Sequence, residues 1–156
     1  MTRYIGTCGI IESCRGPAEV SVIQGGRFEQ AGRRNGLFSV GKIKIGDYTN
    51  DHALFFWDTG ATESILFLPD PERVIQRKPY NSGMIRLADG SLSDVDYYEN
   101  ARLEFVGAMS FHMDLIDVAD MKPDLCDVLI GMDVITKGIF GYDGRTGNFS
   151  FELILE

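Results

Sequence analysis

Asp58 stands between two strongly apolar runs, in the stretch ALFFWDTGATESILFL that covers residues 53–68. Seven residues, D-T-G-A-T-E-S, separate the two runs. An ionised carboxylate in a protein core costs free energy unless it is paired or hydrogen-bonded. The flanking runs therefore predict that this loop lies deep in the protein and that its acid has a chemical role.

Three interpretations of this segment are open. The first is a structural turn, in which the aspartate accepts backbone hydrogen bonds and the glycine takes the unusual dihedrals. The second is a phosphate-binding loop, because Asp58, Gly60, Thr62 and Ser64 resemble the first phosphate loop of the actin and sugar-kinase superfamily. The length of 156 residues argues against that two-domain α/β fold. The third is acid–base catalysis by a carboxylate.

Acid–base catalysis of this kind needs two aspartates. Two carboxyl groups a few ångströms apart cannot both ionise, so they share a proton and titrate as a pair. One then takes a proton from water while the other donates one. The sequence contains a single D-T-G, so the second aspartate must come from another copy of the chain at a two-fold axis.

Short strands separated by turns dominate the rest of the chain. GKIKIG (41–46) alternates as a half-buried strand, and an Asp89-Gly90 turn predicts a hairpin over 84–98. Asp70 and Pro71 predict the start of a short helix. Met109, Phe111, Met113 and Leu115 are expected to line one core face, and Val128 to Gly131 to form a buried strand before one helical turn. The pattern indicates a mostly β domain, either a closed barrel or a sandwich.

Composition narrows the classes of function. The net charge of −8 argues against a general nucleic-acid binder. No apolar run approaches the ~20 residues of a membrane span. The start of the chain lacks the apolar core of a secretory signal, so we expect a cytoplasmic protein. Neither the three cysteines (Cys8, Cys14 and Cys126) nor the two histidines (His52 and His112) have a familiar metal-binding spacing. No metal or cofactor is expected.

The chain changes in composition near residue 36. Residues 1–35 are rich in Gly and contain five Arg but no Asp or Lys. We therefore divide the chain into an N-terminal extension, 1–35, and a domain, 36–156. The extension is interpreted as a prosegment removed by self-cleavage, a cover over a cleft, or extra strands such as EVSVIQ (19–24).

The stretch from Phe56 to Leu66 resembles the active-site loop of retropepsin-like (retroviral-type) aspartic proteases. Two more segments follow in the order of that family: IRLADGS (85–91) resembles its flap hairpin, and VLIGMD (128–133) resembles its hydrophobic-hydrophobic-Gly signature. Three such motifs in order are fairly specific. The resemblance implies a retropepsin-like closed β-barrel, equivalent to half of an acid protease, with a flap hairpin and one or two short helices.

The resemblance also implies roles for the matching residues. Asp58 would be the catalytic aspartate, Thr59 would bond across the dimer, and the Gly60 carbonyl would hold the substrate backbone. Gly131 would let two segments pack closely behind the loop. The residues implied to contact substrate are in the loop and the flap tip: Ala61, Thr62, Glu63, Ala88, Asp89, Gly90 and Ser91.

The sequence thus predicts a homodimeric aspartic endopeptidase that acts on peptide or protein substrates. A non-catalytic peptide-binding module with the same fold is the main alternative, and a phosphate-loop nucleotide-binding protein is a minor one. Two features depart from the family pattern. Trp57 is bulkier than the usual residue before the aspartate and needs a partner for its indole N–H. In retroviral dimers both termini interleave at the interface, and the extension argues against that arrangement here. The last strand, 149–155, could still pair across the interface.

Overall fold

The computed structural model describes residues 2–7, 37–105, 109–123, 126–143, 145 and 148–155. Most of these residues are in β-strands, and the two helices are short. The mostly β fold class predicted from the alternating sequence pattern is therefore confirmed. In this part of the chain, no helix has the length and apolar character needed to cross a membrane.

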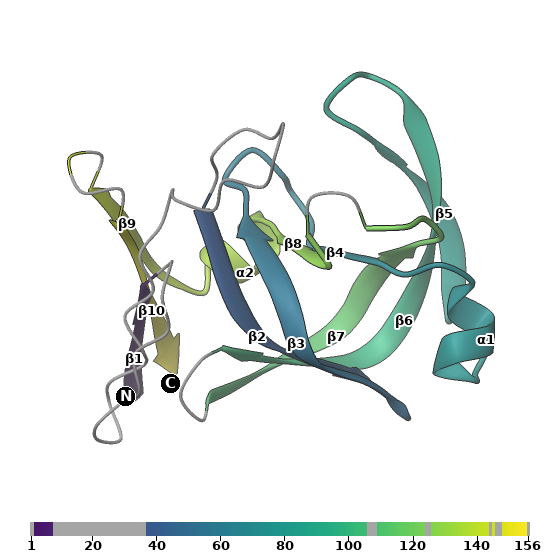
Figure 1. Cartoon of the computed structure of the whole chain (residues 1–156), viewed down its shortest axis with the longest axis horizontal. Helices are drawn as coiled ribbons and strands as arrows, with labels where there is room; N and C mark the ends of the chain where they lie inside the picture. Colours follow the sequence, from purple (N-terminus) through teal and green to yellow (C-terminus); the bar gives the residue numbers. More distant parts are fainter. Residues whose placement is uncertain are drawn as a thin grey trace.

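Seven strands form the main sheet, in the order β2-β3-β8-β4-β7-β6-β5. The sheet closes because β2 also pairs with β6, which makes a six-stranded mixed barrel that leaves β5 outside the ring (Figure 1). The parallel pairings are β3 with β8 and β4 with β7. The bounds are β2 Leu37–Ile45, β3 Tyr48–Trp57, β4 Ile65–Phe67, β5 Asn81–Arg86, β6 Leu92–Phe105, β7 Met109–Ala119 and β8 Val128–Ile130.

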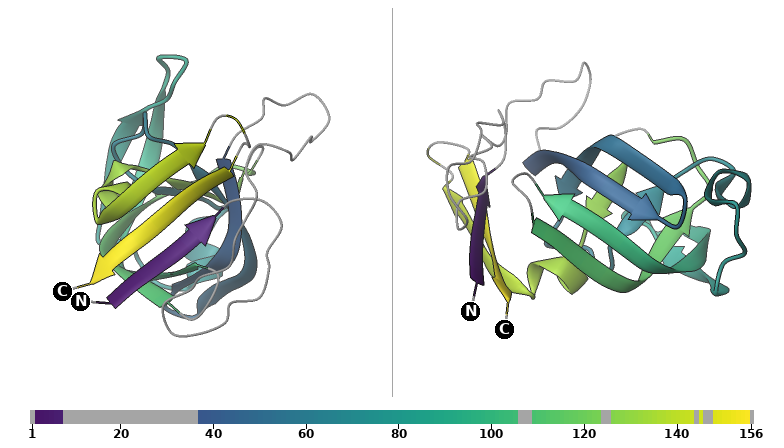
Figure 2. Two further views of the ribbon diagram at one scale, coloured as in Figure 1. Left: turned by 90° about the vertical axis from the view of Figure 1, so that its left-hand side faces the viewer. Right: turned by 90° about the horizontal axis from the view of Figure 1, so that it is seen from below.

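A second, three-stranded antiparallel sheet packs beside the barrel (Figure 2). It contains β1 (Thr2–Thr7), β10 (Asn148–Leu155) and β9 (Gly138–Asp143), with β10 in the middle. The expectation that residues 149–155 pair across a dimer interface is corrected here, because both edges of β10 are paired within the chain. The division at residue 36 stays a prediction. Residues 19–24, Cys8 and Cys14 lie outside the described residues.

The barrel core follows the alternation of the strands. Ile43 and Ile45 are fully buried, whereas Lys44 between them is exposed, so the half-buried strand predicted over 41–46 is confirmed. The two helices also begin where they were expected. α1 (Pro71–Ile75) follows Asp70, and α2 (Met132–Ile135) follows the buried strand β8.

One predicted core face is partly wrong. Met113 is buried and Phe111 partly buried, but Leu115 is exposed, and the described side chains do not include Met109. The alternation breaks because the next residues of β7, from Ile116 to Ala119, are all buried where β7 runs between β6 and β4. Leu115 instead lines a surface pocket.

Candidate active site

Asp58 is held at the end of a barrel strand by its own backbone. Its N–H donates to the carbonyl oxygen of Ile130 (2.9 Å), one step beyond the last residue of β3. The chain then turns, because the Ala61 N–H donates to the Asp58 carbonyl oxygen (3.2 Å). The Gly60 N–H donates to Asp58 Oδ1 (2.8 Å), so one carboxylate oxygen is fixed and the other has no such bond from this turn.

The loop itself is less deep than the sequence predicted. Trp57 and Ser64 at its two ends are buried, but Asp58 is only partly buried, and Thr59 and Gly60 are exposed. The expectation of a deeply buried acid at position 58 is therefore wrong for a single copy of the chain. The physical reason is that the apolar runs form core strands, and the polar residues between them emerge at the end of the barrel.

Ser64 and Asp133 fasten the far end of this loop to the start of α2. The Ser64 hydroxyl donates to Asp133 Oδ1 (2.6 Å), and the Ser64 N–H donates to Asp133 Oδ2 (3.0 Å). The Ser64 hydroxyl oxygen also accepts the N–H of Gly131 (2.9 Å). Sequence reasoning assigned no role to Ser64 or Asp133 in this support. The sequence offered one clue to this support: Ser64 lies in the stretch from Phe56 to Leu66, and Asp133 lies in VLIGMD (128–133).

Gly131 lies against the backbone of the same loop. A Cβ atom at this position would be 2.6 Å from the Glu63 carbonyl oxygen and 3.0 Å from that of Ala61. The neighbouring N–H of Met132 donates to the Ala61 carbonyl oxygen at 2.8 Å. The loop and the β8–α2 turn therefore approach so closely that a side chain at residue 131 would displace one of them.

Trp57 connects the strand before Asp58 to the three-stranded sheet. Its ring packs against Phe105 of the barrel at a centroid distance of 5.3 Å, and against Phe149 and Phe151 of β10 at 5.4 and 4.9 Å. Its Nε1–H donates to the hydroxyl of Ser39 at 2.7 Å in a buried position. Ser39 is thus the hydrogen-bond acceptor that the indole N–H was expected to need. The large Trp57 ring fills the junction between the barrel and the three-stranded sheet.

The hairpin predicted over 84–98 is confirmed as strands β5 and β6. Its tip is closed by bonds from the Leu87 N–H to the Ser91 carbonyl oxygen (2.8 Å) and from the Ser91 N–H to Asp89 Oδ1 (2.9 Å). Gly90 has a φ of 86°, which favours glycine. Hydrogen bonds from the hydroxyl and N–H of Ser91 lower the pKa of Asp89. Ala88 to Ser91 are exposed, and Figure 1 shows the tip of this hairpin projecting beyond the barrel.

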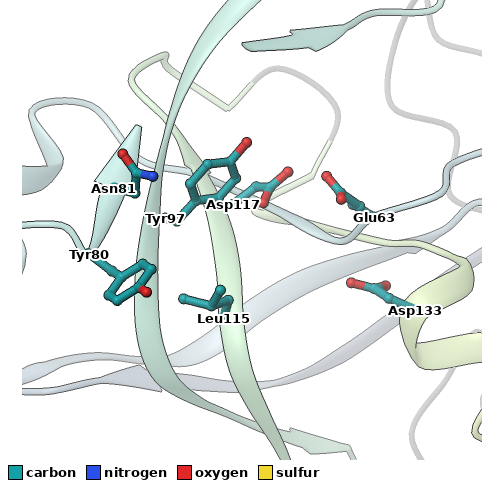
Figure 3. A pocket seen from close by; sticks show the side chains of 7 residues that line it. All are labelled: Glu63, Tyr80, Asn81, Tyr97, Leu115, Asp117 and Asp133. Atoms are coloured by element: carbon teal, nitrogen blue, oxygen red, sulfur yellow. The ribbon is translucent and has the colours of Figure 1, made fainter. Parts of the chain in front are cut away.

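A pocket of about 420 Å³ opens between the Asp58 loop and the base of this hairpin (Figure 3). We call it the acidic pocket because three carboxylates line it. Asn81, Tyr97 and Asp117 form one row across β5, β6 and β7. The complete lining is Glu63, Tyr80, Asn81, Tyr97, Leu115, Asp117 and Asp133.

Asp117 is the buried acid among the residues that the structure describes. It is 6% exposed, and no donor reaches its Oδ2 atom among the described residues. Burial and the neighbouring Glu63 side chain, together with the charge of Asp133, raise the pKa of Asp117 to about 8. Sequence reasoning missed this residue, although an aspartate in the apolar run LIDVA was a signal of the same kind as Asp58.

The described residues contain no group of three His, Cys, Asp or Glu side chains arranged to hold a metal ion. The arrangement around Asp58 is instead one carboxylate on an exposed loop, held by backbone hydrogen bonds. Such a carboxylate can act on water or a substrate directly, as a general acid or base.

The comparisons with known proteins concern the fold. The chain is similar to the crystal structure of a retropepsin-like aspartic protease from Rickettsia conorii, with a TM-score of 0.51 and 14% identity, over 97% of this chain and 94% of that one. It is also similar to the retroviral protease-like domain of Ddi1 from Leishmania major, with a TM-score of 0.44 and 16% identity, over 69% of this chain and 82% of that one. No protein-family model and no curated protein matches the sequence. The chain thus has the retropepsin-like fold that its motifs implied.

Proposed function

We propose that this retropepsin-like chain is an aspartic endopeptidase that works as a homodimer. The observation that carries the proposal is the position of Asp58. It directly follows strand β3 of a retropepsin-like barrel, on an exposed loop where Gly60 donates to one carboxylate oxygen. The closed barrel is not the two-domain α/β fold that a phosphate loop of the actin type requires, so we do not pursue that alternative.

The reaction requires two copies of Asp58 that share one proton. The ionised carboxylate removes a proton from a water molecule, whose oxygen attacks the carbonyl carbon of the peptide bond. The protonated carboxyl gives its proton to the carbonyl oxygen, which forms a neutral gem-diol. When the C–N bond breaks, a proton passes to the leaving nitrogen and the products are an acid and an amine. Neither metal nor cofactor takes part in these steps.

The exposure of the loop and the hairpin tip is consistent with the remaining roles. Thr59 is exposed and available to bond to its counterpart in the second copy. Gly60 is exposed, so its carbonyl is accessible to a substrate backbone, while Thr62 and Glu63 are exposed farther along the same loop. The proposed flap, Ala88 to Ser91, would close over an extended peptide by strand-like hydrogen bonds.

The primary test is the Asp58→Asn variant, assayed with an internally quenched peptide library. We expect loss of all cleavage with the fold retained, because an amide cannot take up the proton from water. Asp47→Asn is the matched control, since Asp47 is an exposed turn residue away from the loop. Cleavage by Asp58→Asn at the wild-type rate would overturn the proposal.

A mixing experiment tests the homodimer separately. An excess of Asp58→Asn protein added to wild type should suppress cleavage, because mixed dimers carry only one aspartate. Sedimentation at several concentrations should show the dimer directly. Wild-type activity that is unaffected by the variant, from a chain that sediments as a monomer, would contradict a shared dyad.

The pairing of β10 favours one second candidate, a monomeric module that binds peptides without cutting them. Because β10 lies between β1 and β9 of its own chain, it cannot join the strands of a second copy in the manner of interleaved termini. This candidate predicts a monomer, no cleavage by wild type, and peptide binding that Asp58→Asn retains. It also predicts an intact chain at mildly acidic pH, whereas a self-removed prosegment would give an Asp58-dependent new N-terminus near residues 30–36.

A further inference from the structure

The acidic pocket is built from separate parts of the fold that converge on one space. Glu63 comes from the Asp58 loop, Asp133 from α2, and Asp117 from the buried part of β7. Figure 3 shows the carboxylates of Glu63 and Asp133 pointing toward Asp117. None of the described residues that line the pocket is Lys or Arg. The pocket therefore brings three acidic side chains together without a basic partner in its lining.

Asp117 supplies the observation that points to a ligand. A buried oxygen atom without a hydrogen-bond donor is destabilising, and most buried polar atoms in proteins have a partner. The Asp117 residue is only 6% exposed. Its Oδ2 atom has no hydrogen-bond partner among the described residues. Asp117 also lines the pocket, so a donor bound there lies next to this carboxyl group.

The rest of the lining determines which donor fits. The Tyr97 ring lies beside Asp117, and Tyr80 and Leu115 add aromatic and apolar surface to the lining. Aromatic faces attract cations, and a long aliphatic stem packs on apolar side chains while its charged end binds carboxylates. The volume of about 420 Å³ falls within the usual range for small-ligand sites. These properties together match an arginine or lysine side chain.

We propose that the acidic pocket binds the basic side chain of a peptide substrate and gives the protein a preference for arginine or lysine at one substrate position. The proposal rests on the proposed peptidase function, because Glu63 lies on the same loop as Asp58 and connects the pocket to the cleavage site.

Binding should depend on pH. The pKa of Asp117 is raised, so this carboxyl holds a proton that an incoming cation must displace. The groups that face it are Glu63, Asp133 and Tyr97, and the pKa of Tyr97 is itself raised by burial and by the charges of Asp117 and Glu63. Because the proton leaves as the cation enters, a basic side chain should bind more tightly as the pH rises toward about 8.

The test measures binding rather than cleavage, so that its outcome is independent of the peptidase proposal. The full-length Asp58→Asn protein is titrated with short capped peptides in which one arginine is moved through every position. Each peptide has a twin with citrulline, which has the shape of arginine without its charge. We expect at least about tenfold tighter binding of arginine over citrulline at one position, which corresponds to about 1.4 kcal/mol.

Glu63→Gln and Asp117→Asn should each reduce this arginine-to-citrulline ratio to near one. Asn resembles the protonated form of Asp117, so that variant should fold, and the exposed Glu63 offers a second variant in any case. Asp114→Asn is the matched control, because Asp114 lies on the same strand with a side chain that is 99% exposed. It changes an exposed carboxylate on the same strand and should keep the ratio.

Three results would overturn the proposal. One is an equal affinity for arginine and citrulline peptides at every position. Another is a ratio that Asp114→Asn lowers as much as Asp117→Asn, which would indicate a general surface field. The third is binding of the free cation agmatine without any preference among the peptides. Absence of cleavage by wild type, with the arginine preference intact, would instead refute the peptidase and leave the pocket assignment standing.

Discussion

The hydroxyl of Ser64 donates to Asp133 Oδ1 at 2.6 Å, across 69 positions of sequence. Ser64 is 1% exposed, and its hydroxyl oxygen also accepts the Gly131 N–H. One side chain therefore ends the Asp58 loop and holds it to the β8–α2 turn. The loop geometry depends on this bond as well as on the local D-T-G turn.

Ser64→Ala should destabilise the fold by about 1–3 kcal/mol, because it leaves the buried Gly131 N–H without its acceptor. Urea unfolding measures this change. Thr62→Ala is the control, since Thr62 is exposed on the same loop, and it should shift the unfolding free energy by less than about 0.5 kcal/mol. Equal effects of the two substitutions would show that the Ser64–Asp133 bond does not support the loop.

Gly131→Ala should be destabilising because its new Cβ would lie 2.6 Å from the backbone oxygen of Glu63. Overpacking of this kind typically costs about 1–3 kcal/mol. If the protein cleaves peptides, activity should fall as well, since the displaced segment carries Asp58. Gly41→Ala is a useful comparison, because its Cβ would meet the Glu104 carbonyl oxygen at 2.3 Å, in the barrel and outside this loop. Gly41→Ala should lower stability as well. The activity of the molecules that remain folded should fall only in Gly131→Ala.

Local signals in the sequence were sufficient for much of the fold. The Asp89-Gly90 turn identified the hairpin, and the alternation of Ile43 and Ile45 with lysines identified a half-buried strand, because both patterns follow from backbone geometry over a few residues. The pairing of β1 with β10 could not be predicted in this way. It joins Thr2 to Leu155 at opposite ends of the chain.

The candidate site was predictable only in part for the same reason. Asp58 is recognisable from its own loop, but the position of an acid relative to the core depends on distant strands. The sequence placed the buried acid at residue 58, whereas the structure places it at Asp117, where β7 is enclosed by β6 and β4. An apolar flank alone does not distinguish an aspartate inside a strand from one in the loop that follows it.

The bond between Trp57 and Ser39 should show coupling in a double-mutant cycle. Ser39→Ala leaves the buried indole N–H without an acceptor, which should cost about 1–3 kcal/mol. Trp57→Phe removes the donor together with packing against Phe149 and Phe151. The double variant should cost less than the sum of the single changes, because each single substitution already breaks the same bond. Additive costs in urea unfolding, followed by circular dichroism, would exclude a significant contribution from this bond.

Stability should decrease as the pH rises through the range in which Asp117 loses its proton. Its pKa in the folded chain, about 8, is higher than the ordinary aspartate value of 3.8, so the folded state binds this proton more tightly than the unfolded state. The stabilisation is complete below a pH of about 3.8 and is lost as the pH rises toward about 8. One proton gives a slope of at most about 1.4 kcal/mol per pH unit.

Asp117→Asn isolates this contribution, because the asparagine cannot ionise. Urea unfolding of the variant and the wild type should be compared from about pH 5 to about pH 8, where most other carboxyl groups are already ionised. Wild type should lose stability relative to Asp117→Asn as the pH rises, whereas Asp94→Asn, at an exposed position of β6, should keep the wild-type slope. Parallel curves for wild type and Asp117→Asn would mean that Asp117 ionises in the folded protein as easily as in the unfolded chain, and that the acidic pocket imposes no cost on its charge.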